Sequence, residues 1–122
     1  MENIADRTFQ RVTINKGLSY NGLDANRNVI ERYRGVALDI SQNGIQLETD
    51  RIIYTQQILL MFFDYQSNYI ATQGRVVYSN KDKSGKFKTG IQLQGTKEEN
   101  LQFVKNLLKT YHYQKRVPIF VS

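Results

Sequence analysis

Two arginines lie close together near the start of the chain, in the segment Arg7-Thr8-Phe9-Gln10-Arg11. A guanidinium group is planar and carries a rigid fork of N–H donors, which matches a phosphate group or the acceptor edge of guanine. It can also stack on the face of an aromatic ring. Arginines four residues apart are common in proteins, however. On its own the pair indicates either an anion-binding site or a solvated chain terminus.

A second polar motif follows, Asp39-Ile40-Ser41-Gln42-Asn43-Gly44. Asp and Ser side chains accept local backbone hydrogen bonds, and Asn-Gly favours positive φ angles, so the motif predicts a tight turn between two strands. The same residues offer a carboxylate that can accept from guanine N–H groups, a hydroxyl, and a glycine that permits close approach. The motif therefore predicts a turn, with or without a ligand site.

Short β-strands are predicted for most of the chain that surrounds these motifs. Apolar and polar residues alternate over residues 45–48, which is the period of a half-buried strand. In the segment before the turn, Tyr33, Val36 and Leu38 are candidates for the core. The expected strands begin or run at residues 12–14, 29–40, 45–48, 57–64, 69–78 and 87–93. Several short strands with turn signals between them indicate a sandwich or a small barrel.

A helix is predicted for the last part of the chain, over residues 96–116. Thr96-Lys97-Glu98-Glu99 fits a capping box, in which Thr96 and Glu99 each hydrogen-bond the backbone amide of the other. Apolar residues then recur at steps of three and four, at Leu101, Val104, Leu107, Leu108 and Tyr111. This stripe is typical of one buried helix face, so we expect it to pack on the core.

Composition limits the class of protein. The chain has 122 residues, the length of one domain, and no cysteine, which excludes disulfides, thiolate metal sites and cysteine nucleophiles. Lysine and arginine outnumber aspartate and glutamate by 17 to 11, which favours an anionic partner. The longest apolar run, residues 58–63, is too short to cross a bilayer, and the first residues do not resemble a signal peptide. We therefore expect a cytoplasmic protein without membrane insertion.

Catalysis is not expected from this sequence. The one histidine, His112, is accompanied by neither a nucleophile nor a set of metal ligands. We therefore expect no enzyme activity, no metal and no cofactor. A barrel that binds single-stranded nucleic acid is a stronger alternative, because the chain is basic and has eight tyrosines for stacking. No RNP-like motif is present, so nucleic acid is not the expected partner.

The arginine pair and the polar turn, in this order, resemble the signature of the PilZ domain family, R-x-x-x-R followed by [DN]-x-S-x-x-G. The matching positions are Arg7, Arg11, Asp39, Ser41 and Gly44. Residues 74–77 and 90–93 also look like later strands of that family. The resemblance extends from Asp6 to the C-terminal helix and therefore covers nearly the whole chain.

The resemblance implies an all-β fold, a six-stranded antiparallel split barrel with a C-terminal α-helix. Within one domain, residues 1–12 would be a flexible segment that carries the arginine motif. Residues 12–95 would form the barrel, and residues 96–116 the helix. The resemblance also implies the ligand cyclic di-GMP, a bacterial second messenger. The function would be that of a receptor whose surface changes on ligand binding, read by a downstream protein of motility, secretion or polysaccharide machinery.

The same resemblance implies a role for each signature residue. Arg7 and Arg11 would hold the phosphates and guanines of the ligand. Asp39 and Ser41 would contact the ligand from the barrel surface. Gly44 would keep the turn open for it.

Other residues refine this expectation. In the family, the residue before the first arginine influences whether one ligand or a stacked pair is bound; here it is Asp6, which predicts one ligand because a carboxylate repels phosphates. Gly90 is expected to lie near the ligand. The loop at residues 80–86, with its lysines and Lys88 after it, is expected to be a solvated hairpin; its lysines would attract the ligand only if the loop faces the site. A PilZ-like module that binds only proteins is the remaining alternative, although retention of all five signature residues argues against it.

Overall fold

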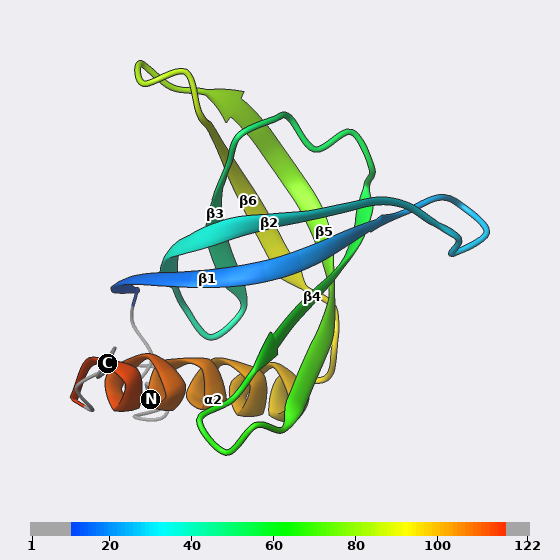
Figure 1. Ribbon diagram of the computed structural model, residues 1–122. Helices are drawn as coiled ribbons and strands as arrows, with labels where there is room; N and C mark the ends of the chain where they lie inside the picture. The colour runs from blue at the N-terminus through cyan, green and yellow to red at the C-terminus, as the bar shows by residue number, and fades with distance from the viewer. Residues whose placement is uncertain (1–10, 117–122) are drawn as a thin grey trace, which may run out of the picture.

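The computed structural model describes residues 11–116, which form a six-stranded antiparallel barrel and one helix (Figure 1). The elements are β1 (Val12–Leu23), β2 (Val29–Ile40), β3 (Gly44–Thr49), β4 (Gln57–Phe63), β5 (Tyr69–Lys81), β6 (Phe87–Leu93) and α2 (Lys97–Arg116). The strands hydrogen-bond in the order β1-β2-β3-β6-β5-β4, and the pairing of β1 with β4 closes the barrel. The predicted fold class is confirmed.

The interior of the barrel is filled by apolar side chains. Along β3, Ile45 and Leu47 point inward and are 3% and 0% exposed, whereas Gln46 between them points outward. The same alternation recurs on β6, where Ile91 and Leu93 are buried. Since the inward side chains fill a barrel of this size, the places for a ligand are on its outer wall or at its ends.

Helix α2 lies across one end of the barrel (Figure 1). Phe103, Val104 and Leu107 from this helix are buried in the core, and the Phe103 ring packs edge-on against Phe62 of β4 at 5.4 Å. Phe103 was not part of the predicted stripe. The capping box is confirmed, because the Thr96 amide donates to Glu99 Oε1 at 2.8 Å and the Glu99 amide to Thr96 Oγ1 at 3.1 Å. Within residues 11–116, no helix is long and apolar enough to cross a membrane.

Two strands contain an extra residue on the wall formed by β2, β3, β6 and β5. In β2, Ala37 pairs with Leu47 and Asp39 with Gln46, so the residue between them has no partner on β3. In β5, the register shifts in the same way between Val76 and Tyr78. Such bulges re-aim the side chains that follow them and are frequent next to functional sites.

Candidate functional site

A recess of about 430 Å³ lies on the wall formed by these four strands. Recesses that bind small molecules have volumes of roughly 300–1,000 Å³. This outer-wall recess brings together four predicted site residues, Arg11, Asp39, Ser41 and Gly44, and it also includes Gly90. Residues from four separate segments of the chain therefore meet at one place. The motif residues that the structure describes therefore line one recess.

The charged part of the outer-wall recess is an ion pair between Arg11 and Asp39. Arg11 Nη1 lies 3.3 Å from Asp39 Oδ1, and the two side chains are 68% and 19% exposed. Arg11 immediately precedes β1. The first residues of β1 pair with the end of β2, and Thr13 is there the partner of Asp39. A guanidinium has five N–H donors, so Arg11 keeps donors for an anionic ligand while it contacts Asp39.

The bulge in β2 explains why Asp39 faces the recess. Ala37 is fully buried, and regular alternation would give Asp39 the same inward direction. The extra residue Leu38 shifts the phase by one, so that Asp39 is on the outer side and Ile40 is fully buried instead. A carboxylate is thereby placed at the surface without a charge in the core.

The turn between β2 and β3 holds Ser41 and Gly44. The Ser41 amide donates to the Gly44 carbonyl at 2.9 Å, and the Ser41 hydroxyl donates to the same oxygen at 3.4 Å. The predicted turn is present, but its predicted positive φ angles are not. Among residues 11–116 only Arg27, Ser67 and Gly85 have them. Glycine suits position 44 for another reason, since a Cβ there would make a tight contact, 3.0 Å, with the carbonyl oxygen of Ile91 on β6.

A row of residues crosses the recess from strand to strand. Asp39 of β2 pairs with Gln46 of β3, Gln46 pairs with Gly90 of β6, and Gly90 pairs with Tyr78 of β5. The recess is also lined by Gln46, Tyr78 and Gln92, which were not among the predicted site residues. Gln46 and Gln92 could have been found as polar residues at outward positions of alternating strands. Tyr78 could not, because its direction depends on a bulge that leaves no clear sequence signal.

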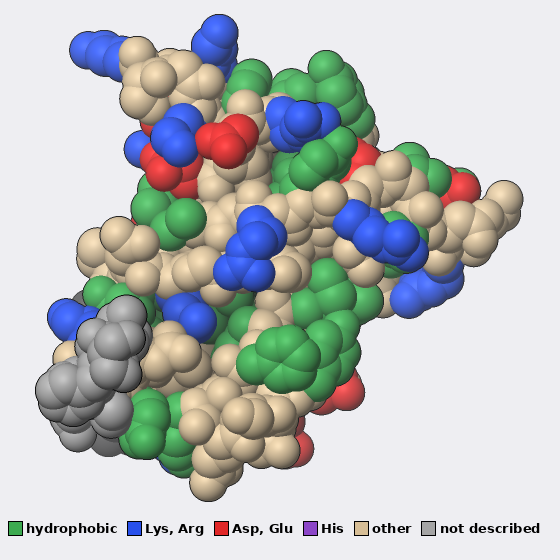
Figure 2. Space-filling model, in the orientation of Figure 1, with side chains coloured by type: hydrophobic (Ala, Val, Ile, Leu, Met, Phe, Trp, Pro, Cys, Tyr) green, Lys and Arg blue, Asp and Glu red, His purple; other side chains and the backbone are tan. Residues whose placement is uncertain are grey.

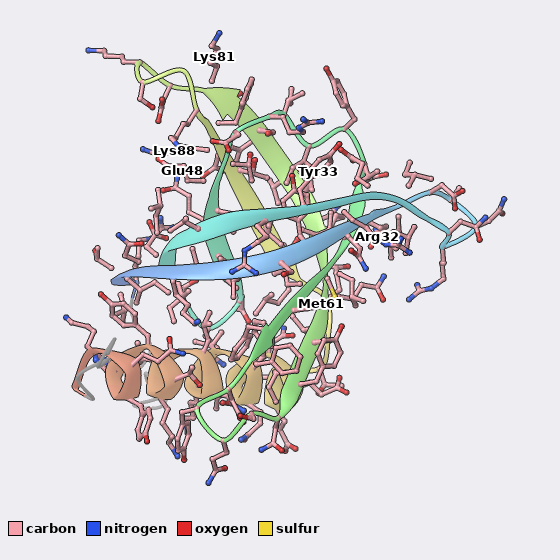
Figure 3. The ribbon with its side chains drawn as sticks, viewed as in Figure 1. Arg32, Tyr33, Glu48, Met61, Lys81 and Lys88 are labelled. Atoms are coloured by element: carbon pink, nitrogen blue, oxygen red, sulfur yellow. The ribbon has the colours of Figure 1, made fainter. Side chains whose placement is uncertain are left out.

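The basic loop between β5 and β6 lies outside the recess and makes its own ion pairs. Lys86 Nζ lies 3.0 Å from Asp50 Oδ1, and Lys88 Nζ lies 3.4 Å from Asp82 Oδ2. Hydrogen bonds from Ser84, together with Lys88, hold the pKa of Asp82 below its usual value. Figure 3 shows Lys88 at the end of the barrel away from α2. On the face in Figure 2, Lys and Arg side chains lie in separate groups. This view thus shows no continuous basic stripe on that face.

Other residues considered in the sequence lie outside the described residues or line a different recess. Arg7 and Asp6 lie outside the described residues, so the first arginine of the motif and the predicted single ligand stay predictions. His112 lines a larger recess of about 720 Å³ between α2 and the β4–β5 turn, which contains none of the signature residues. Within residues 11–116, no group of three or more His, Asp or Glu side chains could hold a metal ion.

Comparison with known proteins identifies the family of this chain. A family model described as PilZ domain matches residues 5–111. No curated protein matches the sequence. The fold is similar to that of the inhibitor of motility MotI/DgrA from Bacillus subtilis, with 16% identity and a TM-score of 0.59 over 96% of this chain and 55% of that one.

Two further solved structures are similar and contain a ligand by their description. The K. pneumonia MrkH–c-di-GMP complex has 18% identity and a TM-score of 0.57, over 95% of this chain and 56% of that chain. The PilZ domain of YcgR from Escherichia coli with c-di-GMP has 10% identity and a TM-score of 0.51, over 89% and 97% of the two chains. This chain thus spans about half the length of MotI/DgrA and MrkH. At these identities the likeness shows a shared fold.

Proposed function

Because the chain belongs to the PilZ domain family, we propose that it is a receptor for cyclic di-GMP, which binds in the outer-wall recess. One observation carries the proposal: the Arg11–Asp39 ion pair, Ser41 and Gly44 line a single recess, although they come from separate parts of the family signature. The MrkH and YcgR complexes, which contain this ligand in the same fold, support it.

Each group in the recess has a proposed role. The exposed guanidinium of Arg11 contacts a ligand phosphate or guanine, and Arg7, the first arginine of the motif, acts with it. The Asp39 carboxylate accepts hydrogen bonds from guanine N–H groups, and its contact with Arg11 keeps both side chains on the recess. The hydroxyl of Ser41 is a further donor. Gly44 lets the ligand approach the backbone, and one ligand is bound.

The output of the receptor is a changed surface, which a downstream protein reads. We propose that this protein belongs to motility, secretion or polysaccharide machinery and that the receptor acts in the cytoplasm without catalysis. The match to the PilZ domain model supports a ligand-binding role rather than catalysis.

Isothermal titration of the chain with cyclic di-GMP tests the proposal. A charge-assisted hydrogen bond contributes about 1.5–3 kcal/mol, so Arg11→Ala, Arg7→Ala or Asp39→Ala should each weaken binding by at least about tenfold. Arg32→Ala is the matched control, since it removes the same charge from an exposed position (Figure 3). Arg32 is seven positions from Asp39 along β2, a distance of about 23 Å, and its removal should leave the affinity unchanged.

GTP and a linear guanine dinucleotide are the specificity controls, and both should bind more weakly. A titration without heat, repeated with a second method such as equilibrium dialysis, would refute the receptor and favour a module that binds only proteins. Equal binding of oligonucleotides of many sequences, with a steep loss of affinity at high salt, would favour the nucleic-acid alternative instead.

A further inference from the structure

Tyr78 faces the outer-wall recess because of the bulge in β5. Before the bulge, Gly74 is buried and Val76 packs on the core, so even-numbered residues point inward. After it, Ser79 points inward and its hydroxyl hydrogen-bonds that of the buried Thr89 at 2.7 Å. The extra residue, Val77, shifts the phase and turns Tyr78 outward. In a regular strand this aromatic ring would share the inward side with Gly74 and Val76.

The Tyr78 ring is held in place over the neighbouring strand. Gly90 is its direct partner on β6, and a Cβ at position 90 would overlap the ring, whose adjacent carbons Cδ2, Cε2 and Cζ are the nearest atoms. One side of the ring therefore lies against the glycine. The phenol oxygen accepts a hydrogen bond from Gln46 Nε2 on β3 at 3.0 Å. Tyr78 is nevertheless 41% exposed, so the other side of the ring is open to a ligand.

The Tyr78 ring and the Arg11–Asp39 ion pair lie on opposite sides of the recess. Asp39 and Tyr78 occupy the two ends of the row that crosses β2, β3, β6 and β5. Three strand spacings separate their Cα atoms, which is about 14 Å. The ring reaches back over Gly90 toward Gln46 and so narrows this gap. A ligand that carries both charged groups and flat aromatic rings would match the ion pair with the former and the Tyr78 ring with the latter.

We propose that the Tyr78 ring is a stacking platform for one purine base of the nucleotide ligand. This inference rests on the proposed function and adds to it an aromatic contact outside the family signature residues. Gln46 donates to the phenol oxygen, but the contact of the ring with Gly90, which phenylalanine would keep, is the one that the platform needs. The platform recognises the base, whereas Arg11 recognises negative charge, so the two contribute to affinity in different ways.

The test compares Tyr78→Leu and Tyr78→Phe in titrations with cyclic di-GMP. A base stacked on an aromatic ring contributes about 1–3 kcal/mol, so Tyr78→Leu should weaken binding by about 5- to 150-fold. Tyr78→Phe keeps the ring and should restore most of the affinity. Tyr54→Leu, at a tyrosine that is 84% exposed and does not line the recess, is the control and should bind like the wild type.

The salt dependence of binding provides a second measurement. Salt screens the attraction between charged groups, so ionic contacts to phosphate make affinity fall as salt concentration rises, and they steepen the slope of log affinity against log salt concentration. Tyr78→Leu should lower the affinity and leave this slope unchanged, whereas Arg11→Ala should reduce the slope. Thermal unfolding of each variant verifies that the barrel is intact.

The outcomes separate the two proposals. If the wild type does not bind cyclic di-GMP, both fail. If it binds and Tyr78→Leu binds equally well, the platform alone is refuted. If Tyr78→Phe loses as much affinity as Tyr78→Leu, the hydroxyl and its Gln46 contact matter and the ring does not, which also refutes the platform.

Discussion

Gly90→Ala is a direct perturbation of the contact between β5 and β6. Gly90 does not have a positive φ, so alanine can adopt its backbone conformation, but the new Cβ would overlap the Tyr78 ring. Two of the ring carbons, Cδ2 and Cζ, lie only 2.7 Å from the Cβ position. The three nearest atoms all belong to this one side chain, which is exposed enough to move. We therefore expect the ring to be displaced and the barrel to stay folded.

The expected change in the free energy of unfolding is the difference between two effects. Replacing glycine by alanine at a compatible position stabilises a protein by about 0.4–1 kcal/mol, because the unfolded chain loses freedom. Displacing the ring removes the hydrogen bond between Tyr78 and Gln46, which contributes about 0.5–1.5 kcal/mol. The net change should stay within about 1 kcal/mol of zero. Binding of cyclic di-GMP should fall nonetheless, because the ring no longer lies over position 90.

Urea unfolding of a double-mutant cycle measures these effects separately. With Tyr78→Ala in the background, Gly90→Ala has no ring to displace and should stabilise the barrel by the full 0.4–1 kcal/mol or so. In the wild-type background the gain should be smaller by about 0.5–1.5 kcal/mol. Equal effects of Gly90→Ala in both backgrounds would refute the described contact. A loss of more than about 3 kcal/mol in both would mean that the Cβ meets the backbone.

Three further changes test the fold around the site. Thr96→Ala removes one side of the capping box with Glu99 and should lower the free energy of unfolding by about 1 kcal/mol, measured by urea unfolding with the distant, exposed Gln114→Ala as control. Burial, and next the charge of a nearby glutamate, raise the pKa of Tyr20 to about 12. The phenol of a tyrosine in an unfolded chain has a pKa of about 10. Between about pH 10 and pH 12 the Tyr20 phenol is therefore protonated in the folded protein and ionised in the unfolded chain. The free energy of unfolding is thus constant below about pH 10 and falls from there to about pH 12. Tyr20→Phe should abolish this fall in alkaline unfolding curves, and an unchanged curve would contradict the assignment. Gly74→Ala places a Cβ 2.5 Å from Cγ2 of Ile91 inside the barrel and should cost about 1–3 kcal/mol, a cost that Ile91→Ala should partly relieve.

Most elements of the fold could be predicted because their patterns are local. The strand that ends before the turn was predicted at residues 29–40 and is β2, and the helix predicted at residues 96–116 is α2. Alternation of apolar and polar residues marks β3, and the capping box marks the start of α2. Arg11 lies next to Asp39 because the antiparallel pairing of β1 with β2 brings the residue before β1 next to the end of β2.

The direction of several side chains could not be predicted, because it depends on register. Tyr33, Val36 and Leu38 were expected in the core, but Tyr33 is 36% exposed, and the fully buried residues of β2 are Ala37 and Ile40. The extra residue in this strand changes the inward side within one segment, and the sequence alone does not indicate where the change occurs.

Similarly, the turn before β3 was attributed to the backbone freedom of Asn-Gly. Its glycine instead accommodates the close approach of the Ile91 carbonyl from a strand more than forty positions later in the chain. Neither the contact nor its partner is visible in a local pattern.

The alternation along β3 and β6 also bears on how such a receptor can change during evolution. Gln46 and Gln92 touch the recess, while their buried neighbours Leu47 and Leu93 do not line it and hold the barrel together. Mutations that retune recognition can therefore accumulate at every second position without loss of foldability. An ancestral wall of this type could diversify toward new ligands, or lose its ligand altogether, while the scaffold is inherited intact.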